Sequence, residues 1–587
     1  MAAKRHTGRV LFAVFAASVL VATACTSGGP TASGAPTAAA SATEKPVQGG
    51  RIIEGSFSDI KILNPMLVND VPSATVTGRI FDALFYADPK TGELKPNLGS
   101  WTVTADGLTY SWEINATANW SDGKPIIAED YLTAVKAVAR SKLTVRKSNF
   151  ELIEGFNDYC VGPASCKGTA TSISGIKIDT ANPKKFTVKF ISVFCPAAVN
   201  AFGTSAGPLP THIYGKYTVD NDNTKNIDAA PENSAPTVTS GPFKFKEWRK
   251  GDQVILDRND TYFKGAPYTD QYVFKVVADS TVAANQLKTG EINFYPGLEP
   301  KDLDDIERQD ALRVIKFQQL SYTYIGWNVK STTAPALADK RVRQALAYGL
   351  DMDAVVKQIV FGQGTKMVAH HPPVSWAFPS AGMEQYAFNK TKAEDLIKSA
   401  GYAKAADGFY AKDGKQLQFS VVANTGNKTR ETLLQVATEQ YKAIGVKLNP
   451  KLEAFETMVD KLTKGNQEIE GWIIGWSLGI EPDPYGIWHS TQIPDPSKST
   501  TGFNFGAFTA PGFDKAIEEG RTPSNGDCSQ ANRKKNYETF NKILNDEQPY
   551  NFGFSPNALV VSQKNMKNLD PGTFSTYWNI EKWWFAK

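Results

Sequence analysis

Strand-like and helix-like segments alternate along this chain, and that alternation limits the available folds more than any other feature. Residues 108–114, LTYSWEI, place apolar side chains at every second position, which is the period of a half-buried strand. Residues 339–360 instead carry apolar side chains near helical spacing, around a predicted break at residues 349–353. A predicted helix at 429–444 ends at Gly445 and leads into a strand, an order typical of α/β units. We therefore predict a mixed α/β fold and exclude the all-helical and all-β classes.

The chain is long enough for several domains, and its charge pattern is not that of a nucleic-acid-binding protein. Its 587 residues are several times the roughly 100 to 200 residues of one domain. Hydrophobic residues make up 41% of the sequence, which is enough to bury large cores and excludes global disorder. Lysine and arginine total 64, aspartate and glutamate total 60, and no long run of one sign occurs. We therefore predict no nucleic-acid partner.

The first 24 residues have the pattern of an export signal. Three basic residues precede a short apolar run at residues 10–21, which ends in small residues before Cys25. Ala22-Thr23-Ala24-Cys25 resembles a bacterial lipobox, in which the cysteine becomes the lipid-modified first residue, although Ala22 stands where leucine is commonest. We predict that residues 1–24 are a lipoprotein signal peptide and that Cys25 carries the lipid. Ordinary secretion is the alternative.

The segment after Cys25 predicts a flexible tether. Residues 26–46 are almost entirely Ser, Thr, Gly, Pro and Ala, which cannot bury a core, so we assign residues 25–47 to the tether. No later segment reaches about 18 uninterrupted apolar residues, the length expected of a membrane-spanning helix. The predicted location is the outer, extracytoplasmic face of the cell membrane, where the lipid on Cys25 anchors the protein.

Four further cysteines suggest disulfides, because an even number of cysteines in an exported chain is typical of a disulfide framework. We predict that Cys160 pairs with Cys166 across a short loop. Cys195 and Cys528 then form a long-range bridge or remain buried thiols. We predict no metal site and no cofactor, since the sequence has no CxxC pair and His370 and His371 are adjacent rather than at helical ligand spacing.

Two pentapeptides fit the GxSxG pattern of serine hydrolases, centred on Ser205 and Ser477. In that class the serine stands on a sharp turn that leads directly into a helix. Here both pentapeptides are followed by proline-rich residues that disfavour a helix. No spacing of carboxylate pairs points to glycosidase chemistry, and the sequence contains neither a Walker loop nor a dinucleotide fingerprint. We therefore do not predict an enzyme and keep a secreted serine hydrolase as a distant alternative.

An ordered series of short motifs gives the sequence its most specific feature. They are Glu93-Leu-Lys-Pro-Asn-Leu-Gly-Ser-Trp101, Trp120-Ser-Asp-Gly-Lys-Pro125, Ala128-Glu-Asp-Tyr131, Ser240-Gly-Pro-Phe243, Gly290-Glu-Ile-Asn293, Arg341-Val-Arg-Gln-Ala-Leu346, and Gly475-Trp476 with Asp483-Pro484. In this order and at this spacing, the set resembles the family 5 extracytoplasmic solute-binding proteins of bacterial peptide ABC importers. The resemblance covers about residues 48 to 587.

The resemblance implies a periplasmic-binding-protein-like fold of type II, cluster C, in which two α/β lobes close over a ligand and an extra domain is inserted in the first lobe. By position, lobe I should comprise residues 48–88, 205–320 and 552–587, with the inserted domain at 89–204 and lobe II at 321–551. Hinge closure removes the ligand from water, and the membrane permease recognises the closed form. We expect a monomer that does no chemistry on its ligand.

The resemblance also suggests ligand-binding residues, beginning with the segment after Trp476. Peptide-binding relatives carry an aspartate there that pairs with the α-amino group of the peptide, but this chain has Gly479 at that position. Glu481 could reach the amine instead, or the ligand lacks one. Trp476 matches a cleft-lining position, and its flat indole suits stacking, with a plain core tryptophan as the alternative. Asp59 stands where relatives place a cleft-lining polar residue, unless it is a solvated turn aspartate.

Three aromatic residues match the family by location rather than by identity: Tyr295, Tyr322 and Phe554. Aromatic side chains at lobe junctions can hold a ligand without selecting its sequence. The alternative for each is a place in the core between the lobes.

We predict a substrate-binding lipoprotein that captures an oligopeptide or peptide-like solute and delivers it to the transmembrane subunits of an ABC permease. The first alternative keeps the family and the role but replaces the peptide with another solute, such as an oligosaccharide or an opine. A sensing role, in which the closed form is passed to a membrane receptor, fits the sequence as well.

Overall fold

The computed structural model describes residues 44–203, 207–218, 226–379, 381–465, 468–498 and 500–587. The chain divides into residues 1–45 and a compact unit, Pro46–Lys587, which is the unit described below. The predicted signal peptide, the predicted lipidation site Cys25 and Ser205 lie outside the described residues. Among the residues described, no helix combines the length and the apolar content that crossing a bilayer requires.

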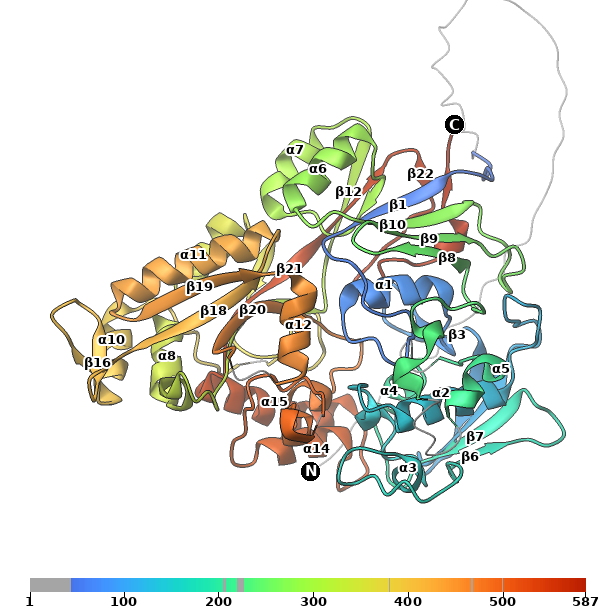
Figure 1. Ribbon diagram of the computed structural model, residues 1–587, viewed down its shortest axis with the longest axis horizontal. Helices are drawn as coiled ribbons and strands as arrows, with labels where there is room; N and C mark the ends of the chain where they lie inside the picture. Colours follow the sequence, from blue (N-terminus) through green and yellow to red (C-terminus); the bar gives the residue numbers. More distant parts are fainter. Residues whose placement is uncertain (1–43, 204–206, 219–225, 380, 466–467, 499) are drawn as a thin grey trace, which may run out of the picture. The chain divides into compact units, whose positions relative to one another are not determined.

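One large sheet organises the compact unit (Figure 1). Its strands follow the order β19-β18-β20-β13-β21-β11-β1-β10-β9-β8, and β12 and β14 also pair with β21. The strands are β1 (Arg51–Ser56), β8 (Phe243–Arg249), β9 (Gln253–Arg258), β10 (Gln271–Val276), β11 (Phe294–Tyr295), β12 (Leu312–Gln318), β13 (Ser321–Trp327), β14 (Gly364–Lys366), β18 (Gln418–Asn424), β19 (Lys447–Glu453), β20 (Gly471–Ser477) and β21 (Tyr550–Gln563).

Smaller sheets are attached to this framework. A four-stranded sheet has the order β4-β5-β7-β6 and lies within the segment predicted to be the inserted domain. Its strands are β4 (Gly99–Val103), β5 (Thr109–Ile114), β6 (Ile176–Ile178) and β7 (Lys185–Lys189). A three-stranded sheet is formed by β15 (Ala403–Lys404), β16 (Tyr410–Lys412) and β17 (Lys415–Gln416). Two further sheets are pairs, β2 (Phe85–Ala87) with β3 (Leu94–Pro96) and β22 (Met566–Lys567) with β23 (Trp584–Phe585).

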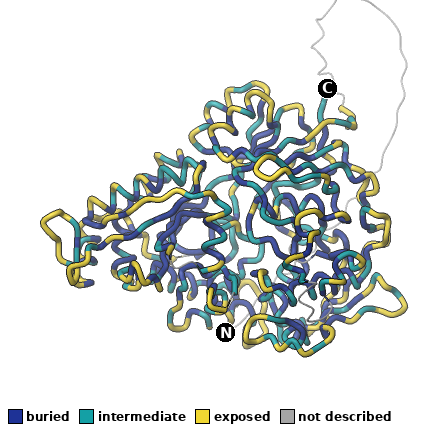
Figure 2. The backbone as a smooth tube through the Cα atoms, viewed as in Figure 1, coloured by how far each residue is buried: buried dark blue, intermediate teal, exposed yellow. Residues whose placement is uncertain are grey.

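Helices connect the strands and cover them, as α11 covers β18 and β19 (Figure 1). They are α1 (Val71–Ile80), α2 (Ala128–Arg140), α3 (Phe156–Tyr159), α4 (Ala197–Asn200), α5 (Thr211–Tyr214), α6 (Ser280–Thr289), α7 (Leu303–Glu307), α8 (Lys340–Tyr348), α9 (Met352–Ala354), α10 (Lys390–Ser399), α11 (Lys428–Ala443), α12 (Phe455–Thr463), α13 (Tyr485–Trp488), α14 (Phe513–Arg521) and α15 (Gln530–Glu547). The strands are mostly buried and the outer helix faces exposed (Figure 2).

The predicted helices have local causes that the structure makes visible. The helix predicted at 429–444 is α11, where Asn427 caps the first turn by accepting a hydrogen bond of 2.9 Å from the backbone N–H of Arg430. Gly445 follows it with φ +74°, the left-handed conformation that ends helices. The helix predicted at 339–360 breaks after α8 and resumes as α9 and a π-helical turn, Val355–Ile359.

Strand β21 belongs to two hydrophobic cores. Its first half pairs with β13, and its second half pairs with β12. We call the apolar cluster formed by residues from 52–294 and 558–583 the first core, and the two clusters formed by residues from 322–554 the second core. The four-stranded sheet contributes to the first core. The domain boundaries given above remain a prediction.

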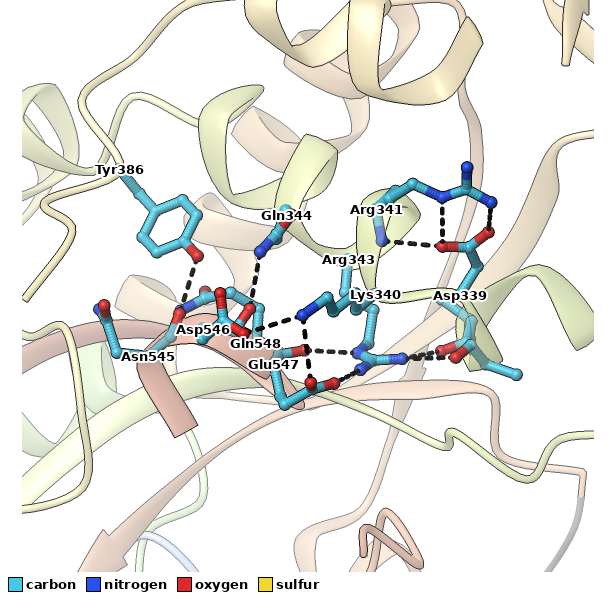
Figure 3. Close-up of polar contacts among 12 residues, drawn as sticks. Asp339, Lys340, Arg341, Arg343, Gln344, Tyr386, Asn545, Asp546, Glu547 and Gln548 are labelled. Carbon is cyan, nitrogen blue, oxygen red and sulfur yellow. Dashed lines mark hydrogen bonds and ion pairs between the residues drawn. The ribbon is translucent and has the colours of Figure 1, made fainter. Parts of the chain in front are cut away.

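The motif Arg341-Val-Arg-Gln-Ala-Leu346 on α8 supports the end of α15 (Figure 3). Arg343 is buried and donates from Nε to the carbonyl oxygen of Glu547 over 2.9 Å. The side-chain amide of Gln344 donates to the carbonyl of Asp546 over 2.7 Å. The last carbonyls of a helix have no partner within it, so α8 supplies the missing donors and positive charge at the negative end of the α15 dipole.

Both pairs of cysteines are joined in the structure. Cys160 and Cys166 have Cα atoms 4.9 Å apart, within the segment of the four-stranded sheet. Cys195 and Cys528 have Cα atoms 5.3 Å apart although 333 positions separate them in the sequence.

Candidate ligand-binding site

The parallel strands of the two cores end at edges that face each other. On the first side β1 runs parallel to β10, and on the second β18 runs parallel to β19 and β20. The segments that follow these strands meet: Phe57 packs edge-on against Phe455 with ring centroids 5.0 Å apart, and Asp279 pairs with Lys428 over 2.9 Å. Ligands of α/β sheets bind in the crevice outside the carboxyl ends of parallel strands. This junction is therefore the candidate site.

A carboxylate from the first side caps a helix of the second side. Oε2 of Glu299 accepts hydrogen bonds from the hydroxyl of Thr429 and, over 3.3 Å, from its backbone N–H in the first turn of α11. Burial raises the pKa of Glu299, and the hydrogen bonds from Thr429 oppose that shift. The positive end of the α11 dipole favours the negative charge there. This contact between Glu299 and Thr429 can form only when the two sides of the junction are close together.

Arg430 brings a positive charge to the same junction. Its Nη1 atom donates to the side-chain oxygen of Asn424, at the end of β18, over 2.8 Å. Its Nη2 atom lies over Gly475, where a Cβ atom would be only 3.0 Å away, so glycine leaves room for the guanidinium. Burial lowers the pKa of Arg430 to about 10. A guanidinium in this position can bind a ligand carboxylate through two parallel hydrogen bonds.

Trp476, one of the predicted ligand-binding residues, follows Gly475 on β20 and belongs to a set of stacked rings. Its indole lies parallel to Phe505, with centroids 5.3 Å apart, and edge-on to Phe503 at the same distance. Trp476 is half-buried, in contrast to the fully buried Trp472 on the same strand. Its ring can therefore contribute to both the core and the cleft.

Tyr322, another predicted residue, is almost fully buried. Its hydroxyl lies 2.8 Å from Nδ1 of His370, and Nε1 of Trp488 donates to the same nitrogen over 3.1 Å. Burial lowers the pKa of His370 well below its usual value, so the ring is neutral. These contacts place Tyr322 within the second core, and its predicted contact with ligand remains a prediction.

Glu481 has a partner inside the protein. Its carboxylate forms a two-pronged ion pair with Arg533 of α15, with one N–O distance of 3.2 Å, and both side chains are largely buried. Burial raises the pKa of Glu481, and Arg533 opposes that shift. The sequence alone indicated an acidic residue available to a ligand amine, but the structure shows one that already neutralises an arginine. Contact with an amine remains a prediction.

The other predicted residues lie in hydrogen-bonded or packed positions. Asp59 follows β1 and accepts from the indole N–H of Trp248 over 3.0 Å and from the backbone N–H of Gly251 over 2.8 Å. Tyr295 is buried in a small apolar cluster beside β1, and Phe554 is buried in the second core. Asp59 thus follows β1 on the first side, Arg430 and Trp476 lie at the ends of β18 and β20 on the second side, and Tyr295 and Phe554 are packed in apolar clusters.

The hydrolase alternative finds no support around Ser477. This residue ends β20 and stands opposite Ser321 in the ladder with β13, rather than on a turn into a helix. His489, the only histidine after it in the sequence, contacts Thr491 over 2.8 Å and Glu518 over 3.2 Å.

Comparison with known proteins decides the family. The profile of the bacterial extracellular solute-binding proteins, family 5, middle region, matches residues 93–496. The chain belongs to this family. It is 29% identical over 588 residues to the oligopeptide-binding protein AppA of Bacillus subtilis, covering 100% of both chains. It is 24% identical to the oligopeptide-binding protein OppA of Lactococcus lactis subsp. cremoris, covering 88% of this chain and 86% of the relative.

Solved structures of the family show the same two-lobed fold. The Bacillus subtilis AppA complex with a nonapeptide superposes with a TM-score of 0.81 at 29% identity, covering 92% of this chain and 100% of that one. Lactococcal OppA, in a closed conformation with an endogenous peptide, gives a TM-score of 0.79 at 20% identity, covering 91% and 99%. The family consists of binding proteins rather than enzymes, which agrees with the sequence prediction at that level.

Sequence reasoning missed Arg430 and Glu299. Arg430 sits in a helix start, NKTRE, that reads as an ordinary capped turn, and Glu299 precedes a proline in a loop. Only its position in the sequence could have identified Arg430 as a candidate. It follows β18 by six residues, and the ends of parallel strands carry ligand contacts.

Proposed function

We propose that this chain captures an oligopeptide or peptide-like solute between its two lobes and delivers it to the permease of an ABC importer. The observation that carries this proposal is the meeting of the two carboxyl edges, where Arg430 lies over Gly475 at the end of β20 and Trp476 is the next residue of that strand. A linear peptide has a terminal carboxylate and flat amide planes, and these two side chains match both features. Relatives named as oligopeptide-binding proteins support the peptide class.

Closure explains how the chain can bind without chemistry. The contacts of Glu299 with Thr429 and of Asp279 with Lys428 form across the junction and hold the lobes together. Water leaves the site when the lobes close, which strengthens polar contacts to the ligand. A permease that recognises the closed form would then receive loaded protein. The predicted lipid on Cys25 would keep the lobes near the membrane while residues 25–47 let them reorient.

The test of the ligand class is native mass spectrometry of the protein purified without its lipid, followed by denaturation to identify what is released. A series of peptide masses is the expected result. A single non-peptide mass, such as that of an oligosaccharide or an opine, would show that the ligand is another solute and not a peptide. Absence of reaction with a fluorophosphonate probe is expected as well, because the hydrolase alternative requires an activated serine.

The role of Arg430 is tested with paired peptides taken from the released series. Arg430→Gln should weaken the binding of a peptide with a free carboxyl terminus at least tenfold, since a charged hydrogen bond contributes about 1.5 to 3 kcal/mol. The affinity for the C-amidated form of the same peptide should be nearly unchanged. Arg341→Gln, on the exposed side of α8, is the matched control. Equal losses for both peptide forms would show that Arg430 does not bind the carboxylate.

A further inference from the structure

The two lobes are joined by chain crossings that lie next to each other. One crossing is the link from β12 to β13 at residues 318–321, and the other is the middle of β21 at residues 555–557. Both β12 and β13 pair with β21, so the two crossings are neighbours in one sheet. Adjacent strand crossings of this kind are the usual place for a hinge between domains.

The Cys195–Cys528 disulfide is a further covalent link between the same two bodies. Cys195 lies between Phe194 and Ala197, which both belong to the first core. Cys528 lies in the loop between α14 and α15, whose residues Phe513 and Phe540 belong to the second core. The bridge therefore connects the two bodies that rotation about the hinge would separate.

The surroundings of the bridge form an interface of their own. The backbone N–H of Cys195 donates to the carbonyl of Arg521 over 3.0 Å, and the side chain of Arg521 donates to the carbonyl of Ser148. Asn200 donates to Asp483 over 2.9 Å, in the segment that follows Trp476. None of these residues belongs to the two hinge crossings. The bridge thus acts at a different point of the boundary from the hinge.

We propose that the Cys195–Cys528 disulfide is a tether that limits how far the cleft opens. The proposal rests on capture of ligand by closure of two lobes, and it holds for any ligand class. A disulfide keeps its Cα atoms within about 4.4 to 6.8 Å of each other. Rotation about a hinge separates residues away from its axis, so the tethered edge opens only as far as the exposed 524–530 segment can deform.

The tether also fixes the part of the cleft that follows β20. Asn200 holds Asp483 from the first-core side, and Arg521 lies 3.7 Å from the same carboxylate. While the bridge is intact these contacts stay close to the loop that carries Glu481. The ligand-free protein should therefore remain near its closed form, and ligand should enter and leave slowly.

The test compares ligand-free proteins by small-angle X-ray scattering. The variant Cys195→Ser/Cys528→Ser removes the tether, and Cys160→Ser/Cys166→Ser is the matched control because that bridge lies within the first-core side. The expected result is a larger radius of gyration for the tether variant than for the wild type or the control. A radius equal in all three proteins would overturn the proposal.

A second measurement covers failure of the tether variant to fold. Cys528 is exposed, whereas Cys160 is fully buried and Cys166 only partly exposed, so a phosphine reductant should open the tether first in the native wild-type protein. Mass spectrometry of alkylated peptides identifies the opened bridge, and scattering is recorded on the same sample. Expansion on opening of Cys195–Cys528 supports the tether, and an unchanged profile refutes it. Neither readout uses a ligand, so failure here is distinct from failure of the proposed peptide binding.

Discussion

Nε2 of His371 lies 2.9 Å from the carbonyl oxygen of Pro482, in the loop that carries Glu481. The side-chain amide of Asn541 donates to Nδ1 of the same ring over 2.9 Å, so the proton is on Nε2 and is donated to Pro482. A neutral, fully buried histidine thus fixes the loop beside the candidate site.

The first prediction concerns pH and His371. Burial lowers its pKa from 6.5 to about 4, so the unfolded chain binds a proton at higher pH than the folded protein. The stability that this ring contributes is present above pH 6.5 and is lost as the pH falls towards 4, by about 3 kcal/mol. His371→Leu should lose less stability than the wild type between pH 7 and pH 5 in urea unfolding. An equal loss of stability in the variant and the wild type over this pH range would contradict the role of His371.

The second prediction concerns Glu54, where the sign is opposite. Burial raises its pKa from 4.5 to about 7, while hydrogen bonds from Tyr272 and Tyr577 and the charge of Arg79 oppose this. The folded protein therefore holds a proton that the unfolded chain releases, and stability falls by about 3 kcal/mol as the pH rises from 4.5 to 7. Glu54→Gln should not show this loss. If the stability difference between variant and wild type is the same at pH 5 and pH 8, the assignment is wrong.

The third prediction separates two arginines of α8. Arg343→Ala leaves Glu547 and the end of α15 without their buried donor, and should lower the free energy of unfolding by about 3 kcal/mol. Arg341→Ala removes an exposed contact with Asp339 and should change little. Chemical denaturation measures both. Similar losses in the two variants would mean that the motif does not act through α15.

The fourth prediction concerns Glu481 and Arg533. Glu481→Gln leaves a buried guanidinium without its counter-charge, so the free energy of unfolding should fall by about 3 kcal/mol. The double change Glu481→Leu with Arg533→Met should recover part of the lost free energy of unfolding. If Glu481 also binds a ligand amine, peptide affinity of the folded Glu481→Gln protein should fall by roughly 2 to 5 kcal/mol. An unchanged affinity would restrict Glu481 to its ion pair.

The fifth prediction concerns the predicted lipid. Cys25→Ala should move the protein from the membrane fraction to the soluble fraction, because it removes the only predicted acylation site. Immunoblots of separated fractions measure this, and Cys160→Ser serves as the control. Retention of the variant on membranes with the signal cleaved would contradict lipid anchoring.

The sequence by itself determined the features that depend on a few neighbouring residues. The mixed class followed from the periods of its segments, the end of α11 from Gly445, and the break after α8 from residues 349–353. The ordered motifs gave the family, which the profile match confirms. These predictions of local structure succeed because backbone propensity and capping act within a turn or two of the chain.

Only the tertiary structure decided which charges are already neutralised at the candidate site. Glu481 and Arg533 are 52 residues apart, and Cys195 and Cys528 are 333 positions apart, so no local pattern could join them. Arg430 became a candidate only when β18 and β20 came side by side and Gly475 left room for its guanidinium. Partners of this kind are set by packing between distant segments, because electrostatic and hydrogen-bond energies depend on distance in space rather than in sequence.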